Sequence, residues 1–231
     1  MYQHAFKRIF DFVSSLTLLI CISPLLLYLA WQVRRHMGSP VLFTQIRPGK
    51  DGRLFRLYKF RSMKDLRDKD GRMLSDAQRM TDFGRRLRAT SLDELPELLN
   101  IVKGDMSVVG PRPQLVQDMM FFTPEEMQRQ FVMPGLTGLA QISGRNNIDW
   151  KQRFAYDLQY ARHITFIEDM RIIFRTIFKV SAQEDIATEG MDTSEDYGDW
   201  LLRRGDITQQ AYDEKQKEAQ KLLDAFEKEH A

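Results

Sequence analysis

Two adjacent carboxylates, Asp93 and Glu94, are the side chains in this sequence whose types and spacing best suit chemistry. They lie in the segment RATSLDELPELLNIVKGDMSVVGPRP, residues 88–113, where a short apolar strand ends in a Pro-Arg-Pro turn. A carboxylate pair beside a tight turn and several arginines could act on an anionic substrate. The helices, strands and loops around the pair must therefore determine its ionisation and its accessibility to substrate.

A helix is expected to begin beside the pair. Ser91 followed three residues later by Glu94 is typical of a capping box, and Pro96 suits a first helical turn, so the start falls at 91–95. The positive end of the helix dipole favours the ionised form of Asp93 and also attracts phosphate. One helix end could thus activate a carboxylate and hold an anion. The simpler alternative is that Glu94 only caps its helix.

Basic residues dominate the region before the pair, although the net charge of the chain is only +2. In the segment YKFR, residues 58–61, strand alternation puts Lys59 and Arg61 on one face, beside aromatic residues. Such a face suits a phosphate or a nucleotide, but a solvated edge strand has the same pattern. The full basic run is Arg47, Lys50, Arg53, Arg56, Lys59, Arg61, Lys64 and Arg67.

Length and composition set the class of protein. The 231 residues, of which 43% are hydrophobic, allow one globular domain with an appendage and exclude collagenous and wholly disordered chains. Cys21 is the one cysteine, so no internal disulfide can form, and it lies in an apolar segment where a thiol packs as a small hydrophobe. We therefore expect the main domain in a reducing compartment.

Residues 12–33, FVSSLTLLICISPLLLYLAWQV, are almost continuously apolar and long enough to cross a hydrocarbon core as a helix. The length of the run and the lack of a small-residue cleavage site disfavour a signal peptide. Both flanks are basic, KR at 7–8 and RR at 34–35, so both ends favour the cytoplasmic side. A helix that enters and turns back satisfies this, and Ser23 and Pro24 at its midpoint would break it. A kinked spanning helix is the alternative.

The rest of the pattern predicts an α+β fold, mainly helical with one small β-hairpin. Strands are expected at 41–46 and 54–63, around a Pro-Gly-Lys-Asp-Gly turn. The Gly-rich segment 134–145 is expected to be a tight loop where backbone approaches a ligand, with structural glycines as the alternative. Helices are expected at 75–87, from Thr123 to before Met133, at 149–162, at 164–180 with a basic stripe of Arg171, Arg175 and Lys179, and at 199–204 and 208–229.

Three parts follow one another along the chain. Residues 1–38 form the membrane helix, residues 39–185 the main domain, and residues 186–231 a linker with a helical hairpin. The acidic segment 183–196 marks the boundary. The hairpin sequence LLRRGDITQQAYDEKQ is similar to short helical modules of the SHOCT type, which implies a homo-oligomer or a docking partner. We expect this tail to be dispensable for chemistry.

Five motifs, in order, resemble the bacterial sugar transferase family, the monotopic phosphoglycosyl transferases, and most closely its small PglC-type members. The resemblance covers about residues 1–185, and the ordered set is specific although no single motif is decisive. The tail after it has no counterpart in the minimal members. The motifs are KRIFD at 7–11, SP at 23–24, YKFRSM at 58–63, TSLDELPELLNIVKGDMSVVGPRP at 90–113 and PGLTGLAQISGR at 134–145.

The resemblance implies transfer of a sugar 1-phosphate from a UDP-sugar to polyprenol (undecaprenyl) phosphate, with release of UMP, at the cytoplasmic face of the cell inner membrane. It implies that Asp93 is the nucleophile, forming an aspartyl phospho-sugar, and that Glu94 binds a Mg²⁺ cofactor. The residues agree, because a carboxylate can attack phosphorus once charge is neutralised and Mg²⁺ prefers hard oxygen ligands. The expected substrate-binding residues are Lys59, Arg61, Arg88, Arg112, Arg145 and Asp157.

Two other classes of protein are alternatives. A membrane-tethered nucleic-acid binder would use the basic region for backbone contacts. A membrane-tethered, non-catalytic scaffold would use a basic anion-binding face and the C-terminal hairpin. Neither explains the pair Asp93 and Glu94 or the Pro-Arg-Pro turn, so we expect no nucleic acid among the partners.

Overall fold

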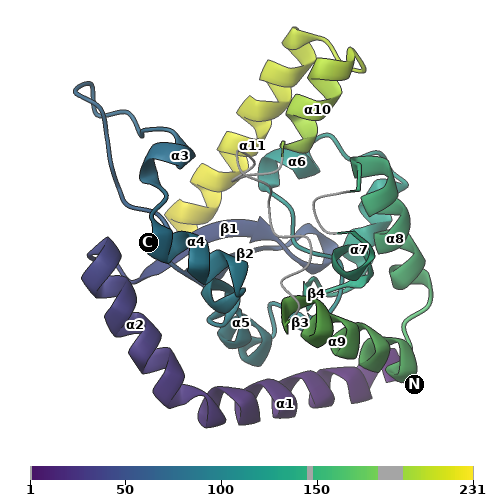
Figure 1. Cartoon of the computed structure of the whole chain (residues 1–231). Coiled ribbons are helices and arrows are strands. Elements are labelled where there is room, and N and C mark those ends of the chain that lie inside the picture. Colours follow the sequence, from purple (N-terminus) through teal and green to yellow (C-terminus); the bar gives the residue numbers. More distant parts are fainter. Residues whose placement is uncertain (1, 145–147, 182–194, 231) are drawn as a thin grey trace.

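The fold is α+β, as predicted, and the computed structural model describes residues 2–144, 148–181 and 195–230. Figure 1 shows helices arranged around two small sheets. Short helical turns occur at Tyr2–Phe6, Lys50–Gly52, Leu92–Glu94 and Glu126–Phe131. The strands are β1 (Leu42–Pro48), β2 (Leu54–Phe60), β3 (Ser107–Val109) and β4 (Gly135–Thr137). The α-helices are α1 (Lys7–Cys21), α2 (Ser23–Met37), α3 (Asp76–Arg79), α4 (Asp82–Ala89), α5 (Glu97–Lys103), α6 (Val116–Met119), α7 (Leu139–Ser143), α8 (Trp150–Arg162), α9 (Phe166–Ser181), α10 (Tyr197–Arg204) and α11 (Gln209–Glu229).

The apolar N-terminal segment is a bent pair of helices, α1 and α2, that runs around one side of the molecule (Figure 1). The break lies where the sequence predicted it: Pro24 stands in the first turn of α2, and the Ser23 hydroxyl donates to the carbonyl of Ile20 over 2.8 Å. Within the described residues, no single helix is both long and apolar enough to cross a bilayer. The pair together passes that test by length and composition, with a bend of 66°.

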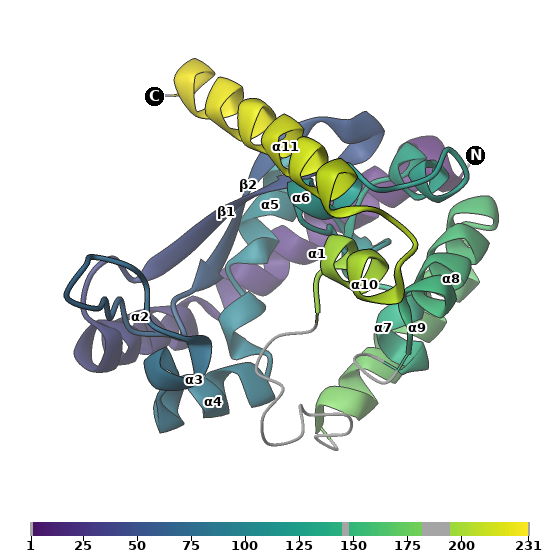
Figure 2. The same ribbon diagram turned by 90° about the horizontal axis from the view of Figure 1, so that it is seen from above.

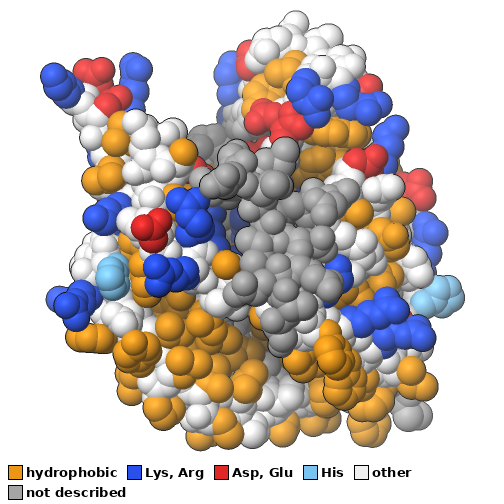
Figure 3. All heavy atoms as spheres, in the orientation of Figure 1, with side chains coloured by type: hydrophobic (Ala, Val, Ile, Leu, Met, Phe, Trp, Pro, Cys, Tyr) orange, Lys and Arg blue, Asp and Glu red, His pale blue; other side chains and the backbone are white. Residues whose placement is uncertain are grey.

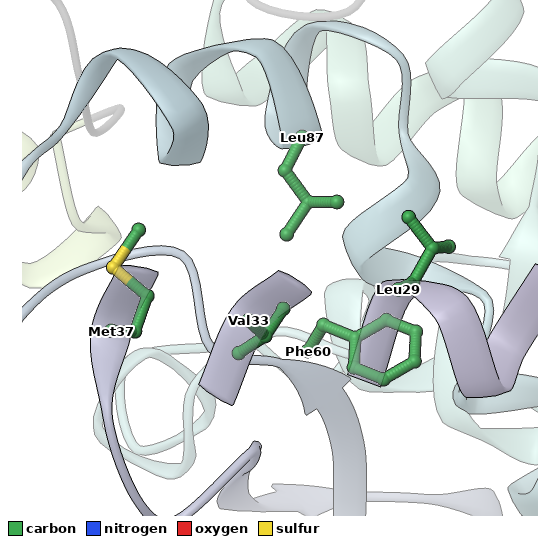
Figure 4. Packing of buried hydrophobic residues seen from close by; sticks show 5 residues of the cluster. All are labelled: Leu29, Val33, Met37, Phe60 and Leu87. Carbon is green, nitrogen blue, oxygen red and sulfur yellow. The ribbon is translucent and has the colours of Figure 1, made fainter. Parts of the chain in front are cut away.

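The inner face of α2 packs against the main domain. Leu29, Val33 and Met37 recur at helical spacing and are buried. Figure 4 shows them facing Phe60 at the end of β2 and Leu87 on α4. The second half of the bent pair is therefore part of the core.

Buried polar contacts fix α1 as well. Nζ of Lys7 lies 2.6 Å from Oδ2 of Asp169 on α9, and the hydroxyl of Tyr160 donates to the other oxygen of this carboxylate. One turn later the carboxylate of Asp11 accepts a 2.7 Å bond from the Ser107 hydroxyl on β3. Buried ionised groups are tolerated when they are paired in this way. The two ends of the KRIFD motif thus dock the first helix onto the main domain.

Strands β1 and β2 form the predicted antiparallel hairpin, with Thr44 opposite Tyr58 and Ile46 opposite Arg56. The second strand ends at Phe60, three residues earlier than expected. Both faces of the hairpin are covered by helices. Phe55 and Leu57 pack against α5, whereas Ile46 and Leu54 pack against α6 and α11.

The helix predicted at 75–87 is two helices, α3 and α4, separated at Met80. Met80 has extended backbone angles, and the next residue, Thr81, begins α4 by accepting a bond from the backbone N–H of Gly84. Threonine is a favourable N-cap residue because its hydroxyl accepts a hydrogen bond from a backbone N–H that has no partner within the helix. The helix expected after Thr123 is instead a 3₁₀ helix at Glu126–Phe131, while the expected helices at 149–162 and 164–180 correspond to α8 and α9.

The segment predicted as a tight loop at 134–145 contains strand β4 and helix α7. Strand β4 pairs in parallel with β3. A Cβ on Gly135 would lie 2.0 Å from the backbone nitrogen of Gly110, and a Cβ on Gly138 would lie 2.2 Å from the Gly110 oxygen. Gly135 and Gly138 are thus structural, because backbone approaches backbone at both positions.

The tail forms the predicted helical hairpin, α10 and α11, turning at Gly205 with a φ of 75°. It packs on the main domain: Tyr197 and Trp200 of α10 are buried, and Figure 2 shows α11 lying over β1, β2 and α6. Leu222 on α11 is 41% exposed. Most of the acidic linker expected at 183–196 lies outside the described residues.

Candidate active site

Asp93 and Glu94 lie on the 3₁₀ turn Leu92–Glu94, between α4 and α5. The predicted capping box is wrong. Ser91 has a left-handed backbone with a φ of 53° and makes no side-chain cap, and the α-helix begins only at Glu97. The carboxylate of Glu94 is instead turned toward two cations, so tertiary charge contacts replace the local cap.

Glu94 is the anionic centre of the site. Nζ of Lys59 and Nη2 of Arg112 each lie 2.7 Å from its Oε1. Burial alone would raise the pKa of Glu94, but the charges of Arg112 and Lys59 and the bonds they donate lower it well below its usual range. Glu94 is therefore ionised at neutral pH. The structure brings together three of the predicted site residues here.

The pKa of Asp93 is shifted in the opposite direction from that of Glu94. Asp93 is 8% exposed, and burial, followed by the negative charge of Glu94, raises its pKa to about 6. Lys59, Arg88 and Arg112 oppose this rise. The sequence predicted that a helix dipole would favour the ionised form of Asp93. In the structure, burial has the larger effect and raises the pKa instead. A carboxyl group with this pKa is still mostly ionised at neutral pH, and it is more basic than an exposed aspartate.

Glu97 is a third acid of the site, which sequence reasoning missed. It is 1% exposed, and its Oε1 lies 3.1 Å from Nζ of Lys59. Burial raises its pKa to about 7, while Lys59 opposes that rise. Its spacing of three residues from Glu94 is the signal that could have found it, because residues i and i+3 of a helical segment are neighbours.

The other predicted cations are placed differently. Arg88 donates to the Ser62 hydroxyl at 3.0 Å, and its charge helps to lower the pKa of Asp93, so it belongs to the site. Arg61 lies beyond the end of β2 and donates to the backbone carbonyl of Met63, away from Glu94. Arg145 lies outside the described residues.

Asp157 on α8 is buried and is bound by Arg129, another residue that sequence reasoning missed. Nε and Nη2 of Arg129 lie 2.9 and 2.7 Å from its Oδ2. Arg129 also donates to the backbone carbonyl of Arg112 over 2.6 Å. In the structure, Asp157 therefore orients the residue that holds Arg112, and its role in binding substrate stays a prediction.

Comparison with known proteins places this arrangement in a family. A family model described as bacterial sugar transferase matches residues 2–183. The chain belongs to the bacterial sugar transferase family. Its matched region contains Asp93, Glu94 and the cations around them, whereas α10 and α11 lie beyond it.

Three relatives illustrate the range of this transferase family. EpsL of Bacillus subtilis, described as an uncharacterized sugar transferase, is 45% identical over 189 residues, which are 82% of this chain and 94% of the relative. An undecaprenyl-phosphate galactose phosphotransferase of Salmonella typhimurium is 40% identical, over 74% of this chain and 39% of the relative. A UDP-glucose:undecaprenyl-phosphate glucose-1-phosphate transferase of Klebsiella pneumoniae is 42% identical, over 75% and 40%. The chain thus matches about two fifths of the length of the latter two.

The described residues of the site could hold a divalent cation together with oxygen atoms of a bound substrate. Among the described residues, no group of three or more His, Cys, Asp or Glu side chains is placed to bind a metal. The ionised carboxylate of Glu94 is one hard oxygen donor, and phosphate oxygens of a substrate can supply others. Such a donor set fits Mg²⁺, which is often bound by one or two carboxylates plus phosphates and water.

Proposed function

We propose that the protein transfers a sugar 1-phosphate from a UDP-sugar to polyprenol phosphate and releases UMP. The observation that carries this proposal is the pairing of a buried, basic carboxylate, Asp93, with an ionised neighbour, Glu94, that is held between Lys59 and Arg112. The names of the Salmonella and Klebsiella relatives support undecaprenyl phosphate as the acceptor, and the Klebsiella name also supports a UDP-sugar donor.

In the proposed first step, a carboxylate oxygen of Asp93 attacks the phosphorus nearest the sugar. A P–O bond to Asp93 forms, the P–O bond to UMP breaks, and UMP leaves with the electron pair. In the second step, a phosphate oxygen of polyprenol phosphate attacks the same phosphorus and the Asp93 carboxylate is released. Lys59, Arg88 and Arg112 neutralise the charge that accumulates between these anions.

Mg²⁺ is proposed as the cofactor, with Glu94 as its protein ligand. The ion would neutralise charge on the transferred phosphate when bound. Glu94 suits this task because its low pKa keeps an anionic oxygen available at neutral pH. Lys59, held by the buried Glu97, keeps a second positive charge at the same carboxylate.

We also propose that the protein is monotopic, with α1 and α2 re-entering the cytoplasmic face of the inner membrane. Figure 3 shows hydrophobic side chains gathered along the edge formed by α1 and α2 and at one end of α9. Leu27, Ile167 and Phe178 are 73%, 77% and 74% exposed, which is costly in water and favourable in lipid. Arg171 and Arg175 on α9 add cations suited to anionic headgroups.

The test is UMP release from purified protein with Mg²⁺, polyprenol phosphate and a panel of UDP-sugars, starting with UDP-glucose and UDP-galactose. Asp93→Asn keeps the shape but removes the nucleophile, so turnover should be abolished while the donor still binds. Glu94→Gln should be severe, with partial recovery in excess Mg²⁺. Asp82→Asn, an equivalent change at an exposed aspartate of α4, is the matched control and should leave the rate unchanged.

A covalent route makes one further demand. Labelled UMP should exchange into the UDP-sugar without any acceptor, because the first half-reaction is reversible by itself. Exchange that strictly needs polyprenol phosphate, or substantial turnover by Asp93→Asn, would replace the covalent route by direct transfer between bound substrates. Absence of UMP release with every donor would favour the non-catalytic scaffold instead.

A further inference from the structure

The C-terminal hairpin is joined to the active site through aromatic packing. Tyr197 of α10 is 4% exposed, and its ring meets Phe154 of α8 edge-on, with 5.0 Å between ring centroids. Trp150 and Trp200 enclose it at 5.1 and 5.8 Å. Rings packed in this way contribute both buried area and specific geometry. The first turn of α10 therefore packs against α8.

The next link is the guanidinium of Arg129. It lies 6.0 Å from the centroid of the Phe154 ring, within range of a cation–π contact. Asp157, three residues after Phe154 on the same helix, binds this guanidinium through two nitrogens. The helix α8 therefore supplies one ring and the carboxylate that orient Arg129, and Phe122 supplies a second ring at 5.6 Å. Movement of α8 would move Arg129.

Arg129 is connected in turn to the carboxylate of Glu94 through Arg112. Its Nη2 donates to the backbone carbonyl of Arg112 over 2.6 Å, and Arg112 reaches Oε1 of Glu94 over 2.7 Å. Arg129 therefore fixes the peptide from which the Arg112 side chain projects. The described contacts run without a gap from Tyr197 in the tail to Glu94.

A second attachment joins the tail to α6, the helix that follows the Pro-Arg-Pro turn. The backbone N–H of Tyr197 donates to Oδ1 of Asp118 over 2.7 Å, in a buried bond. Asp118 lies on α6, which begins at Val116, shortly after the Pro-Arg-Pro turn at 111–113. Tyr197 thus contacts the turn that carries Arg112 by two routes, through its ring to α8 and Arg129 and through its backbone N–H to α6.

We propose that Tyr197 is a positioning residue, and that the C-terminal hairpin holds Arg112 on Glu94 for phospho-sugar transfer. This inference rests on the proposed function. It gives the tail a part in the chemistry, in contrast to the expectation from sequence that residues after 185 are dispensable. The contact therefore joins α10, which lies outside the part of the chain matched by the family model, to residues inside that part.

The test compares full-length variants that differ at one aromatic residue of the hairpin. Tyr197→Leu removes the ring, Tyr197→Phe keeps it, and Phe226→Leu makes an equivalent change on α11, where the ring faces Arg56 instead of Arg129. Turnover of Tyr197→Leu should fall about ten-fold or more with little change in the KM for the UDP-sugar, since misplacement of a charge affects the chemical step most. Tyr197→Phe and Phe226→Leu should stay within about two-fold of the parent chain, well short of that loss.

A second readout does not depend on the reaction. Backbone hydrogen exchange in residues 107–119 should quicken in Tyr197→Leu and stay unchanged in Phe226→Leu, because only the first change loosens the Pro-Arg-Pro turn. Should Tyr197→Leu fail to fold, Tyr197→Met, with a longer and more adaptable side chain, takes its place. Unchanged exchange, or equal effects of the Tyr197 and Phe226 changes, overturns the inference. A parent chain without UMP release would count against the proposed function alone, since exchange still measures the coupling.

Discussion

The ammonium group of Lys59 lies 3.1 Å from the carboxylate of Glu97, a side chain that is 2% exposed. The same ammonium group contacts Glu94, so one lysine serves two acids at the site. Glu97 thereby helps to keep Lys59 beside Glu94. Loss of the lysine would leave a buried acid without its partner, which costs more than loss of a surface charge.

Lys59→Met should therefore lower both stability and turnover. We expect a loss of about 2 kcal/mol in the free energy of unfolding, because Glu97 loses its counter-charge in a buried site. Adding Glu97→Gln should recover most of the stability but none of the turnover, since the charge near the phosphate is still missing. Thermal unfolding in detergent and UMP release measure the two effects. A Lys59→Met protein as stable as the parent chain would contradict the pairing.

The raised pKa of Asp93 predicts a pH-dependent rate. As the proposed nucleophile, Asp93 must be ionised, so kcat/KM should fall as the pH is lowered through about 6, the pKa that burial and Glu94 give to this carboxyl group. At pH 5 the rate should be about one tenth of its limit at higher pH. Glu97, with a pKa of about 7, could add a second step, so the profile should also be measured in Glu97→Gln. A flat profile down to pH 5 in that variant would argue against Asp93 as the titrating group.

Residue type and local pattern predicted the features that depend on neighbours in sequence. Pro24 broke the apolar helix where expected, and Gly205 divided the C-terminal hairpin. The carboxylate pair and its partners Lys59 and Arg112 were found from the pattern and the family resemblance together. Local rules work there because a missing N–H or a left-handed turn acts within a few residues.

Long-range pairings could not be predicted in the same way. Arg129 and Asp157 are 28 residues apart in sequence, and nothing local distinguishes this arginine from the many others. The capping prediction failed at Ser91 for a related reason, because Lys59 and Arg112 hold the Glu94 carboxylate that the cap would have used. Tertiary charge contacts outweighed a local hydrogen bond worth about 1 kcal/mol.

The bend between α1 and α2 predicts the topology of the N-terminus. In a chain with Cys21→Ser, single cysteines at Gln3 and at Ser39 should both be labelled only from the cytoplasm. Replacing Ser23 and Pro24 by good helix formers should straighten the pair and expose the Gln3 position to the periplasm, since the break removes helical hydrogen bonds. Periplasmic labelling at Gln3 with the native bend intact would show that the segment spans the membrane.

The raised pKa of Asp118, which binds the backbone of Tyr197 in the tail, predicts how the free energy of unfolding depends on pH. Burial, and then the negative charge of Asp196, raise the pKa of Asp118 from 3.8 to about 6, although the backbone N–H groups of Tyr197 and Leu115 oppose the rise. The folded protein therefore favours protonated Asp118. Its stabilising effect is fully present below about pH 4 and is lost as the pH rises through about 6.

Asp118→Asn cannot ionise, yet it still offers an oxygen to the N–H of Tyr197. Its stability relative to the parent chain should rise by up to about 3 kcal/mol between pH 4 and pH 7, the energy equivalent of a pKa raised from 3.8 to about 6. The new amide group also faces the N–H of Leu115, a cost that does not change with pH. The slope of the difference, measured by urea unfolding in detergent at several pH values, is therefore the decisive quantity. A difference that stays constant from pH 4 to pH 7 would mean that Asp118 has the same pKa in the folded and unfolded chains, so that folding does not raise it.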